Sequence, residues 1–197
     1  MIGAIVLAAG LSTRMGSPKM LLKWGSTTVI EQVVDSLNQA GVDEVVVVAG
    51  ALYEEIKKLL DKWDVIVVVN PNYRNGEMTD SLQTGLSELS QSTAAAMIVL
   101  GDQPFVSPKT MRTLTQAFEK TSHNIVMPSI NNRRGHPWII RRTLWDEIMK
   151  LQAPLTMRDF MRSNQEDIHY VLVEDENIVK DMDTPEDYRR MQPKKES

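Results

Sequence analysis

Short apolar runs and longer amphipathic stretches alternate over the first half of the chain. The apolar runs are rich in valine and isoleucine and lack polar alternation, which is typical of parallel strands buried on both faces of a sheet. We therefore predict four strands, at residues 2–9, 45–49, 65–69 and 97–100.

The stretches between these runs have the periodicity of amphipathic helices. Residues 28–40 repeat apolar positions on one helical face, and Gly41 follows as a stop signal. Further helices are predicted at residues 53–63 and 80–90, and Ser107 before Pro108 is a typical start of a fourth. This alternation predicts an α/β fold with three layers and a mostly parallel, Rossmann-like sheet, whose ligands bind at the carboxyl ends of the strands.

The second half of the chain is less regular. We predict strands at residues 124–130, 136–142 and 168–175, helices at 142–150 and 153–163, and a frayed tail at 191–197. Since the chain has 197 residues, we expect a single domain over 1–197.

Composition and charge exclude several classes of function. A net charge of -4 argues against general affinity for nucleic acid or an anionic membrane. The absence of cysteine excludes disulfides, thiolate zinc sites and cysteine nucleophiles. The apolar start of the chain is too short for a membrane span and has no basic leader, so we expect a cytoplasmic protein.

A glycine-containing loop, LAAGLSTRMGSPK at residues 7–19, follows the first predicted strand. Gly10 and Gly16 allow positive φ and close approach of backbone amides to phosphate, while Arg14 and Lys19 add positive charge. The loop matches neither the Walker pattern nor G-x-G-x-x-G. It is either a phosphate-binding loop or a polar turn with solvated cations, and its place after the first strand favours phosphate.

Candidate metal-binding carboxylates occur at two places later in the chain. Asp102 in LGDQP ends a predicted buried strand and is either an Mg²⁺ ligand or the cap of a turn before Pro104. Asp181 and Asp183 precede TPED, which is itself typical of helix capping. A cationic loop together with separated carboxylates is the minimum needed for metal-assisted attack on a nucleoside triphosphate.

The motifs LAAGLSTRMGSPK, LGDQP, GHP and DMDTPEDY resemble those of the molybdenum cofactor nucleotidyltransferase family, which is related to the sugar-phosphate nucleotidyltransferases. LAAG, GDQP and GHP resemble the cytidylyltransferase branch more than the guanylyl branch. The resemblance implies Mg²⁺-dependent transfer of CMP from CTP to the phosphate of molybdopterin, with release of pyrophosphate. It also implies a nucleotide-binding part at about 1–105 and an acceptor-binding and metal-completing part at about 106–190.

The resemblance also implies roles for individual residues. Lys19 would neutralise the α-phosphate and, with Arg14, hold the triphosphate, so that no side-chain nucleophile is needed. Asp102 and Asp183 would hold Mg²⁺, with help from Asp181 left open. The remaining implied contacts are nucleotide binding by Leu7, Ala8, Ala9, Gly10 and Ser81, and acceptor binding by Gly135, His136 and Pro137.

Two segments depart from the family pattern. Glu77 and Asp80 interrupt the region that is often serine-rich, and APLTMRDFMRS at 153–163 replaces a glycine-rich stretch. Two alternatives within the same chemistry therefore stay open. The nucleotide could carry another base, and the acceptor could be another phosphorylated molecule such as a sugar phosphate. A nucleotide- or cofactor-binding chaperone that serves a client molybdoenzyme is the alternative outside catalysis.

Three further sets of side chains have ordinary interpretations. A basic cluster of arginines either attracts an anionic pterin phosphate or is solvated surface charge. His123 and His169 lack ligand spacing, and the methionines favour core packing, with Met97, Met111 and Met149 as examples. The arginines of the cluster are Arg133, Arg134, Arg141 and Arg142.

Overall fold

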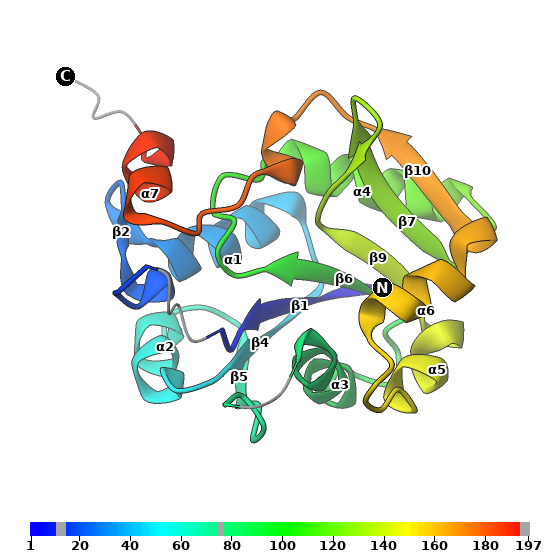
Figure 1. Cartoon of the computed structure of the whole chain (residues 1–197), viewed down its shortest axis with the longest axis horizontal. Coiled ribbons are helices and arrows are strands. Elements are labelled where there is room, and N and C mark those ends of the chain that lie inside the picture. The colour runs from blue at the N-terminus through cyan, green and yellow to red at the C-terminus, as the bar shows by residue number, and fades with distance from the viewer. Residues whose placement is uncertain (11–14, 75–76, 194–197) are drawn as a thin grey trace.

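The protein was analysed as a computed structural model, which describes residues 1–10, 15–74 and 77–193. One eight-stranded sheet runs through the chain in the order β10-β7-β9-β6-β1-β4-β5, and β8 pairs with β7 (Figure 1). Its strands are β1 Ile2–Ala8, β4 Glu44–Ala49, β5 Ile66–Val69, β6 Ala95–Leu100, β7 Ile125–Ile130, β8 Arg133–Arg134, β9 Trp138–Arg141 and β10 Ile168–Leu172.

The central strand β1 pairs in parallel with β4 on one side and β6 on the other. Strand β9 is inserted antiparallel between β6 and β7, and β7 pairs in parallel with β10. Because β9 runs against β6, the start of β9 lies at the edge where β1, β4 and β6 end. Loops from both halves of the chain therefore meet at one edge of the sheet, which lies on the left in Figure 1.

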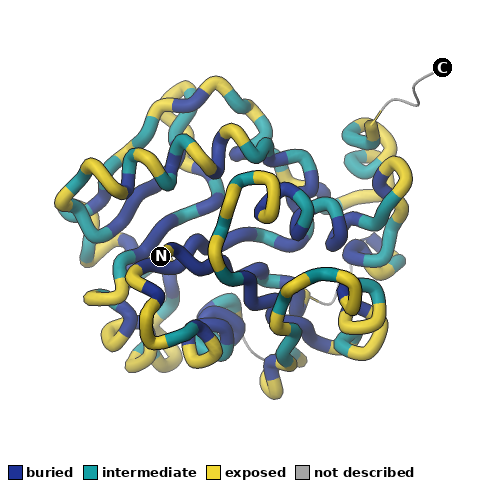
Figure 2. Tube along the Cα trace, turned by 180° about the vertical axis from the view of Figure 1, so that it is seen from behind, coloured by how far each residue is buried: buried dark blue, intermediate teal, exposed yellow. Residues whose placement is uncertain are grey.

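Helices cover both faces of the sheet and bury two hydrophobic clusters. One face packs against α1 Val29–Ala40, α2 Tyr53–Leu60 and α4 Pro108–Lys120. The other packs against α3 Met78–Glu88, α5 Trp145–Met149 and α6 Met157–Ser163. Figure 2 shows the central strands as buried and the outer helical turns as exposed. The predicted three-layer α/β fold with a mostly parallel sheet is confirmed.

Side-chain caps decide where several helices begin. Thr28 forms a capping box with Glu31 at the start of α1, which agrees with the predicted helix at residues 28–40. The prediction for α3 was two residues late, because Glu77 and Asp80 form a capping box that starts the helix at Met78. The two acidic residues that depart from the family pattern therefore cap α3.

Other boundaries also shift. The predicted helix 53–63 ends at Leu60, and the predicted helix 153–163 begins at Met157, where Thr156 and Asp159 form a capping box. The remaining short elements connect these units. They are the β2 Lys23–Trp24 and β3 Thr27–Thr28 pair and the 3-10 turns η1 Lys19–Leu21, η2 Arg142–Leu144, η3 Gln165–Asp167 and η4 Glu176–Val179.

Two predictions of burial were wrong. Strand β5 is an edge strand, so Ile66 and Val69 are 42% and 45% exposed instead of buried on both faces. Met149 ends the short helix α5 and is 44% exposed, whereas Met97 and Met111 are buried as predicted.

The last described helix, α7 Pro185–Met191, begins at Thr184, which forms a capping box with Asp187. The capping interpretation of TPED is thus confirmed. Met191, placed in the predicted frayed tail, is the last residue of this helix and packs against a small cluster that includes Met15, Trp24 and Met182. Within the described ranges, every helix is too short or too polar to cross a bilayer.

Candidate active site

The ends of β1 and β6 lie side by side and bring the first two motifs together. Leu7 is in register with Leu100, and the Gly101 amide donates to the Leu7 carbonyl at 3.0 Å. A Cβ at Gly101 would lie 2.9 Å from the same carbonyl oxygen, so the close approach of the two loops requires glycine there. Asp102 therefore leaves the sheet beside the residue 7–10 segment.

Three charged side chains converge at this edge. Lys19 Nζ lies 3.2 Å from Asp102 Oδ2 and 2.7 Å from Asp183 Oδ1. The Lys19 side chain is only 9% exposed, while those of Asp102 and Asp183 are 29% and 40% exposed. Residues 164 positions apart in the chain thus share one hydrogen-bonded cluster, with the ammonium inside and the carboxylates facing solvent.

Burial and charge act in opposite directions on Lys19. Burial acts to lower the pKa of its ammonium, but the hydrogen bonds and charges of Asp183 and Asp102 outweigh burial and raise the pKa above its usual value. Burial, followed by the charges of Asp102 and Asp183, raises the pKa of Asp181. Asp102 and Asp183 therefore stabilise the charged form of Lys19, and their charges oppose ionisation of Asp181.

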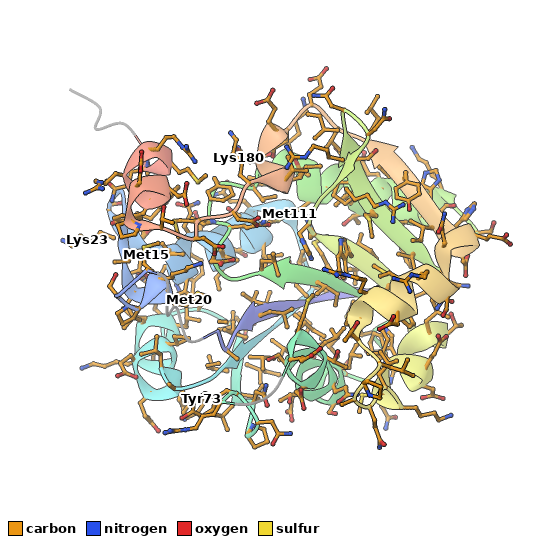
Figure 3. All side chains as sticks on the ribbon, in the orientation of Figure 1. Met15, Met20, Lys23, Tyr73, Met111 and Lys180 are labelled. Atoms are coloured by element: carbon orange, nitrogen blue, oxygen red, sulfur yellow. The ribbon has the colours of Figure 1, made fainter. Side chains whose placement is uncertain are left out.

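Hydrogen bonds to its backbone hold the segment that carries Asp181 and Asp183 against the sheet. Gln103, which is buried, donates from Nε2 to the Lys180 carbonyl at 2.9 Å. The His136 amide donates to the Ile178 carbonyl at 3.1 Å. Figure 3 shows Lys180 on this segment, above the ends of β1 and β6, with Met15 and Met20 beside those ends. The second, third and fourth motifs are thereby joined through backbone contacts.

The GHP motif leads into β9 and packs tightly against η4. A Cβ at Gly135 would lie 2.2 Å from the Ile178 carbonyl oxygen, so the contact excludes any larger residue. The His136 ring stacks on Trp138 with centroids 4.2 Å apart and an interplanar angle of 23°. Gly135 thus has a structural role, and the His136 ring is held at the same sheet edge as Lys19.

The carboxylates fit a divalent cation in part. Asp102 and Asp183 already converge on one positive group, and hard oxygen ligands suit Mg²⁺ or Mn²⁺. Among the residues that the structure describes, no group of three or more His, Asp or Glu side chains has metal-binding geometry. Phosphate oxygens and water would have to complete the coordination, as is usual for Mg²⁺ in phosphoryl-transfer sites.

The other residues predicted to bind nucleotide differ in their burial and in their contacts. Ala8 and Ala9 are buried, Gly10 is exposed at the loop, and Gly16 has the predicted positive φ, 67°. Ser81 is buried in α3 and its hydroxyl accepts from Asn70 Nδ2 at 3.0 Å, so its contact with nucleotide stays a prediction. Arg14 lies outside the described residues.

The basic cluster does not form one surface. Arg134 lines a pocket beside His136, whereas Arg141 pairs with Ala95 at the start of β6, on the opposite edge. The Arg141 guanidinium lies 4.3 Å from the Phe118 ring centroid and that of Arg142 lies 4.6 Å from Trp145. Of the four arginines, Arg133 and Arg134 therefore lie near the site, whereas Arg141 and Arg142 do not.

Sequence reasoning missed two residues at this sheet edge. Gln103 stands inside the quoted LGDQP motif, so its place beside Asp102 was the available signal. Thr79 has a buried hydroxyl that lacks a partner among the described residues, and nothing in its sequence context marks it.

Comparison with known proteins follows the geometry. A profile of the MobA-like NTP transferase domain matches residues 4–168. The chain belongs to the MobA-like NTP transferase family. Membership of this nucleotidyltransferase family indicates an enzyme. The described parts of the motifs that carry the resemblance lie around one sheet edge.

Relatives in the MobA-like family differ in the nucleotide that their names specify. The molybdenum cofactor cytidylyltransferase of Escherichia coli (strain K12) is 25% identical over 189 residues, which cover 95% of this chain and 93% of that protein. A probable molybdenum cofactor guanylyltransferase of Natranaerobius thermophilus is 29% identical over 135 residues, which cover 68% of this chain and 62% of that protein.

The fold of a crystallised protein is also similar. Rv0371c from Mycobacterium tuberculosis H37Rv superposes with a TM-score of 0.83 at 29% identity, and the match covers 96% of both chains. A second crystal structure of that protein is a complex with manganese. A protein of similar structure therefore binds manganese.

Proposed function

We propose that this protein transfers CMP from CTP to the terminal phosphate of a molybdopterin-type acceptor and releases pyrophosphate. The observation that carries the proposal is the convergence of Lys19, Asp102 and Asp183 at the ends of β1 and β6. A buried ammonium and two solvent-facing carboxylates supply the opposite charges that a triphosphate and its metal ion require.

The proposed reaction is an in-line displacement at the α-phosphorus of CTP. An oxygen of the acceptor phosphate forms a bond to this phosphorus, and the bond to the oxygen that bridges to the β-phosphate breaks. The electron pair leaves on pyrophosphate. Lys19 stabilises the negative charge that develops on the α-phosphate, and the residue 7–10 backbone positions the nucleotide.

Asp102 and Asp183 hold a divalent cation in this proposal, with Mg²⁺ as the physiological ion. When bound, the cation supplies positive charge to the departing pyrophosphate. The manganese complex of the similar mycobacterial protein supports a divalent ion in this fold. Gln103 holds the segment that carries Asp183 through its hydrogen bond to the Lys180 carbonyl. This hydrogen bond therefore contributes to the position of the Asp183 carboxylate as a metal ligand.

The proposal assigns CTP and not GTP as the nucleotide for two reasons. The LAAG and GDQP motifs resemble the cytidylyltransferase branch, and the E. coli cytidylyltransferase aligns over 95% of the chain, against 68% for the guanylyltransferase. The acceptor is assigned to molybdopterin because both relatives are named for the molybdenum cofactor.

A pyrophosphate-release assay tests the proposal. The protein is incubated with Mg²⁺, molybdopterin and each of the four nucleoside triphosphates in turn, and glucose 1-phosphate replaces molybdopterin in a parallel series. We expect release with CTP and molybdopterin. Release with GTP alone would move the chain to the guanylyl branch, and release with glucose 1-phosphate would replace the acceptor. Nucleotide binding without release from any pair would support a binding protein instead.

A further inference from the structure

A second pocket opens at the same edge of the sheet, between α3 and α6 and beside the GHP motif. Its volume is about 510 Å³, within the range of small-molecule sites. Segments distant in sequence form its walls, and the α6 wall comes from the stretch that departs from the family pattern. The apolar side chains that line it are Met78, Met127, Trp138, Met157 and Met161.

Two polar atoms in the lining residues lack partners. His136 Nε2 and Thr79 Oγ1 are shielded from solvent and have no hydrogen bond within the described ranges. Thr79 is only 7% exposed and also borders a neighbouring, more polar pocket. Leaving a buried polar group without a partner is destabilising, so two such atoms beside one pocket point to a ligand that supplies the missing bonds.

The imidazole of His136 is uncharged at neutral pH. Burial lowers the pKa of His136 to about 4. Its Nε2 therefore acts as one nitrogen of a neutral ring, whose donor or acceptor role depends on the tautomer. A group that binds there must be polar without needing a charged histidine.

The shape of the walls favours a flat ligand. His136 is already stacked on Trp138, and the Trp138 Nε1 donates to the Gly135 carbonyl at 2.8 Å, which fixes the indole. Methionine side chains adapt to a ring and make favourable sulfur–aromatic contacts. Binding through His136 Nε2 and Thr79 Oγ1 requires that these shielded atoms become accessible, and the flexibility of methionine side chains allows such a shift.

The charges at the pocket are unequal. The residues in the lining include Arg134 and Arg158, both exposed, against the single carboxylate of Glu77. The Arg134 guanidinium rests 5.3 Å from the Tyr170 ring centroid, which holds it in place from one side. An acceptor that carries negative charge next to its ring is therefore favoured.

We propose that this pocket binds the acceptor through a flat, uncharged heteroaromatic ring, to which Thr79 Oγ1 and His136 Nε2 donate or accept hydrogen bonds and whose anionic substituent is attracted by Arg134 and Arg158. The inference rests on the proposed function, because it concerns the acceptor of that reaction. It assigns acceptor recognition to Thr79, Arg158 and the methionines, in addition to the GHP motif. A sugar phosphate lacks the flat face that the stacked rings and methionines fit.

Substitution of Thr79 and Thr84, both on α3, makes a matched pair. Thr79→Val removes a hydroxyl without a partner, whereas Thr84→Val removes one that donates to the Asp80 carbonyl at 2.8 Å. The probe is 6-carboxypterin, a flat ring with a negative charge, and glucose 1-phosphate is the anion without such a ring. Isothermal titration calorimetry on the full chain gives the two dissociation constants.

We expect 6-carboxypterin to bind and glucose 1-phosphate not to bind at the same concentrations. Thr79→Val should raise the dissociation constant for the pterin about five- to tenfold with no loss of thermal stability, and Thr84→Val should change it less than twofold. His136→Phe, which keeps an aromatic ring and removes the nitrogen, should act like Thr79→Val. A wild-type chain that does not bind the pterin, or an unchanged affinity in both variants, overturns the inference.

The pyrophosphate assay separates this inference from the proposed function. If no triphosphate is cleaved but pterin binding still depends on Thr79 and His136, the pocket assignment holds and the proposed reaction fails. If CTP and molybdopterin react while Thr79→Val and His136→Phe leave both pterin affinity and the KM for molybdopterin unchanged, the reaction holds and the pocket assignment fails.

Discussion

Two regions at one sheet edge are built on different principles. The cluster of Lys19, Asp102 and Asp183 is made of charges held by hydrogen bonds of 3.2 and 2.7 Å. The pocket beside His136 is made largely of methionine and aromatic side chains, with two polar atoms that lack partners in the described structure. In the two proposals above, the charged cluster serves the chemistry and the adaptable pocket selects the acceptor.

The largest expected effect comes from breaking the charged cluster. Lys19→Ala removes the cation beside the α-phosphate and should lower kcat by about 10²–10⁴-fold, with a smaller change in nucleotide affinity. Asp102→Ala should lower turnover by a similar factor while the fold survives. Pyrophosphate release measures the rate, and circular dichroism checks the fold.

Lys23→Ala is the control for Lys19→Ala, because Lys23 is exposed and lies just beyond η1 (Figure 3). It should retain near-normal turnover. A Lys19→Ala chain that keeps wild-type kcat would contradict the assignment of Lys19 to the reaction.

A second substitution tests the junction between the two regions. Gly135→Ala places a Cβ 2.2 Å from the Ile178 carbonyl oxygen and should lower the free energy of unfolding by about 3 kcal/mol, because backbone must move. Gly10→Ala, with no heavy atom within 4 Å of the added Cβ, is the control for stability. Urea denaturation measures both, and equal stability of the two variants would show that the junction adapts.

The pH dependence of stability tests the neutral histidine of the pocket. The pKa of His136 falls from 6.5 to about 4 on folding, so the unfolded chain binds more protons between these values. The contribution of the neutral His136 to the free energy of unfolding is fully present above pH 6.5. It is lost as the pH falls toward 4, which lowers the free energy of unfolding by roughly 2–3 kcal/mol. Urea denaturation of the wild type and His136→Gln at pH 7.5 and 4.5 should show a smaller loss in the variant. Equal losses would mean that His136 is not the group responsible.

The smallest expected effect concerns the hydrogen bond that holds the segment of Asp183. Gln103→Ala removes the bond to the Lys180 carbonyl and should cost about 1–2 kcal/mol of stability. The Mg²⁺ concentration needed for half-maximal turnover should also rise, because a ligand is less well positioned. Gln83→Ala is the control. It removes hydrogen bonds from α3 to the carbonyls of Ile148 and Leu151, which in the described structure do not contact the segment of Asp183. An unchanged Mg²⁺ requirement for Gln103→Ala would limit Gln103 to packing.

Two members of the charged cluster were predictable because Lys19 and Asp102 each lie in a short motif that follows a strand. Parallel strands bring their carboxyl ends to one edge, so Lys19 and Asp102 follow from local patterns and one topological rule. The boundary of α3 was missed because the capping box of Glu77 and Asp80 overrides the apolar periodicity. Strand β5 was misjudged because periodicity does not identify a sheet edge.

The pocket could not be predicted in the same way. Met78, Met127 and Met157 are far apart in the chain, and each alone is an ordinary core residue. The insertion of β9 antiparallel to β6 is what brings His136 to the edge, and no motif in the sequence specifies the direction of that strand. The proposed acceptor pocket therefore depends on tertiary arrangement, while the charged groups are visible in sequence.

The contact of Lys19 with both aspartates has a thermodynamic consequence. A divalent ion placed between Asp102 and Asp183 competes with the ammonium for the same oxygen atoms, so the ion alone should bind weakly. A triphosphate that attracts Lys19 would free those oxygen atoms, and each ligand would then strengthen the binding of the other by the same factor. In the proposed reaction the lysine would thereby link metal occupancy to nucleotide occupancy, and we expect the two to bind together as a complex.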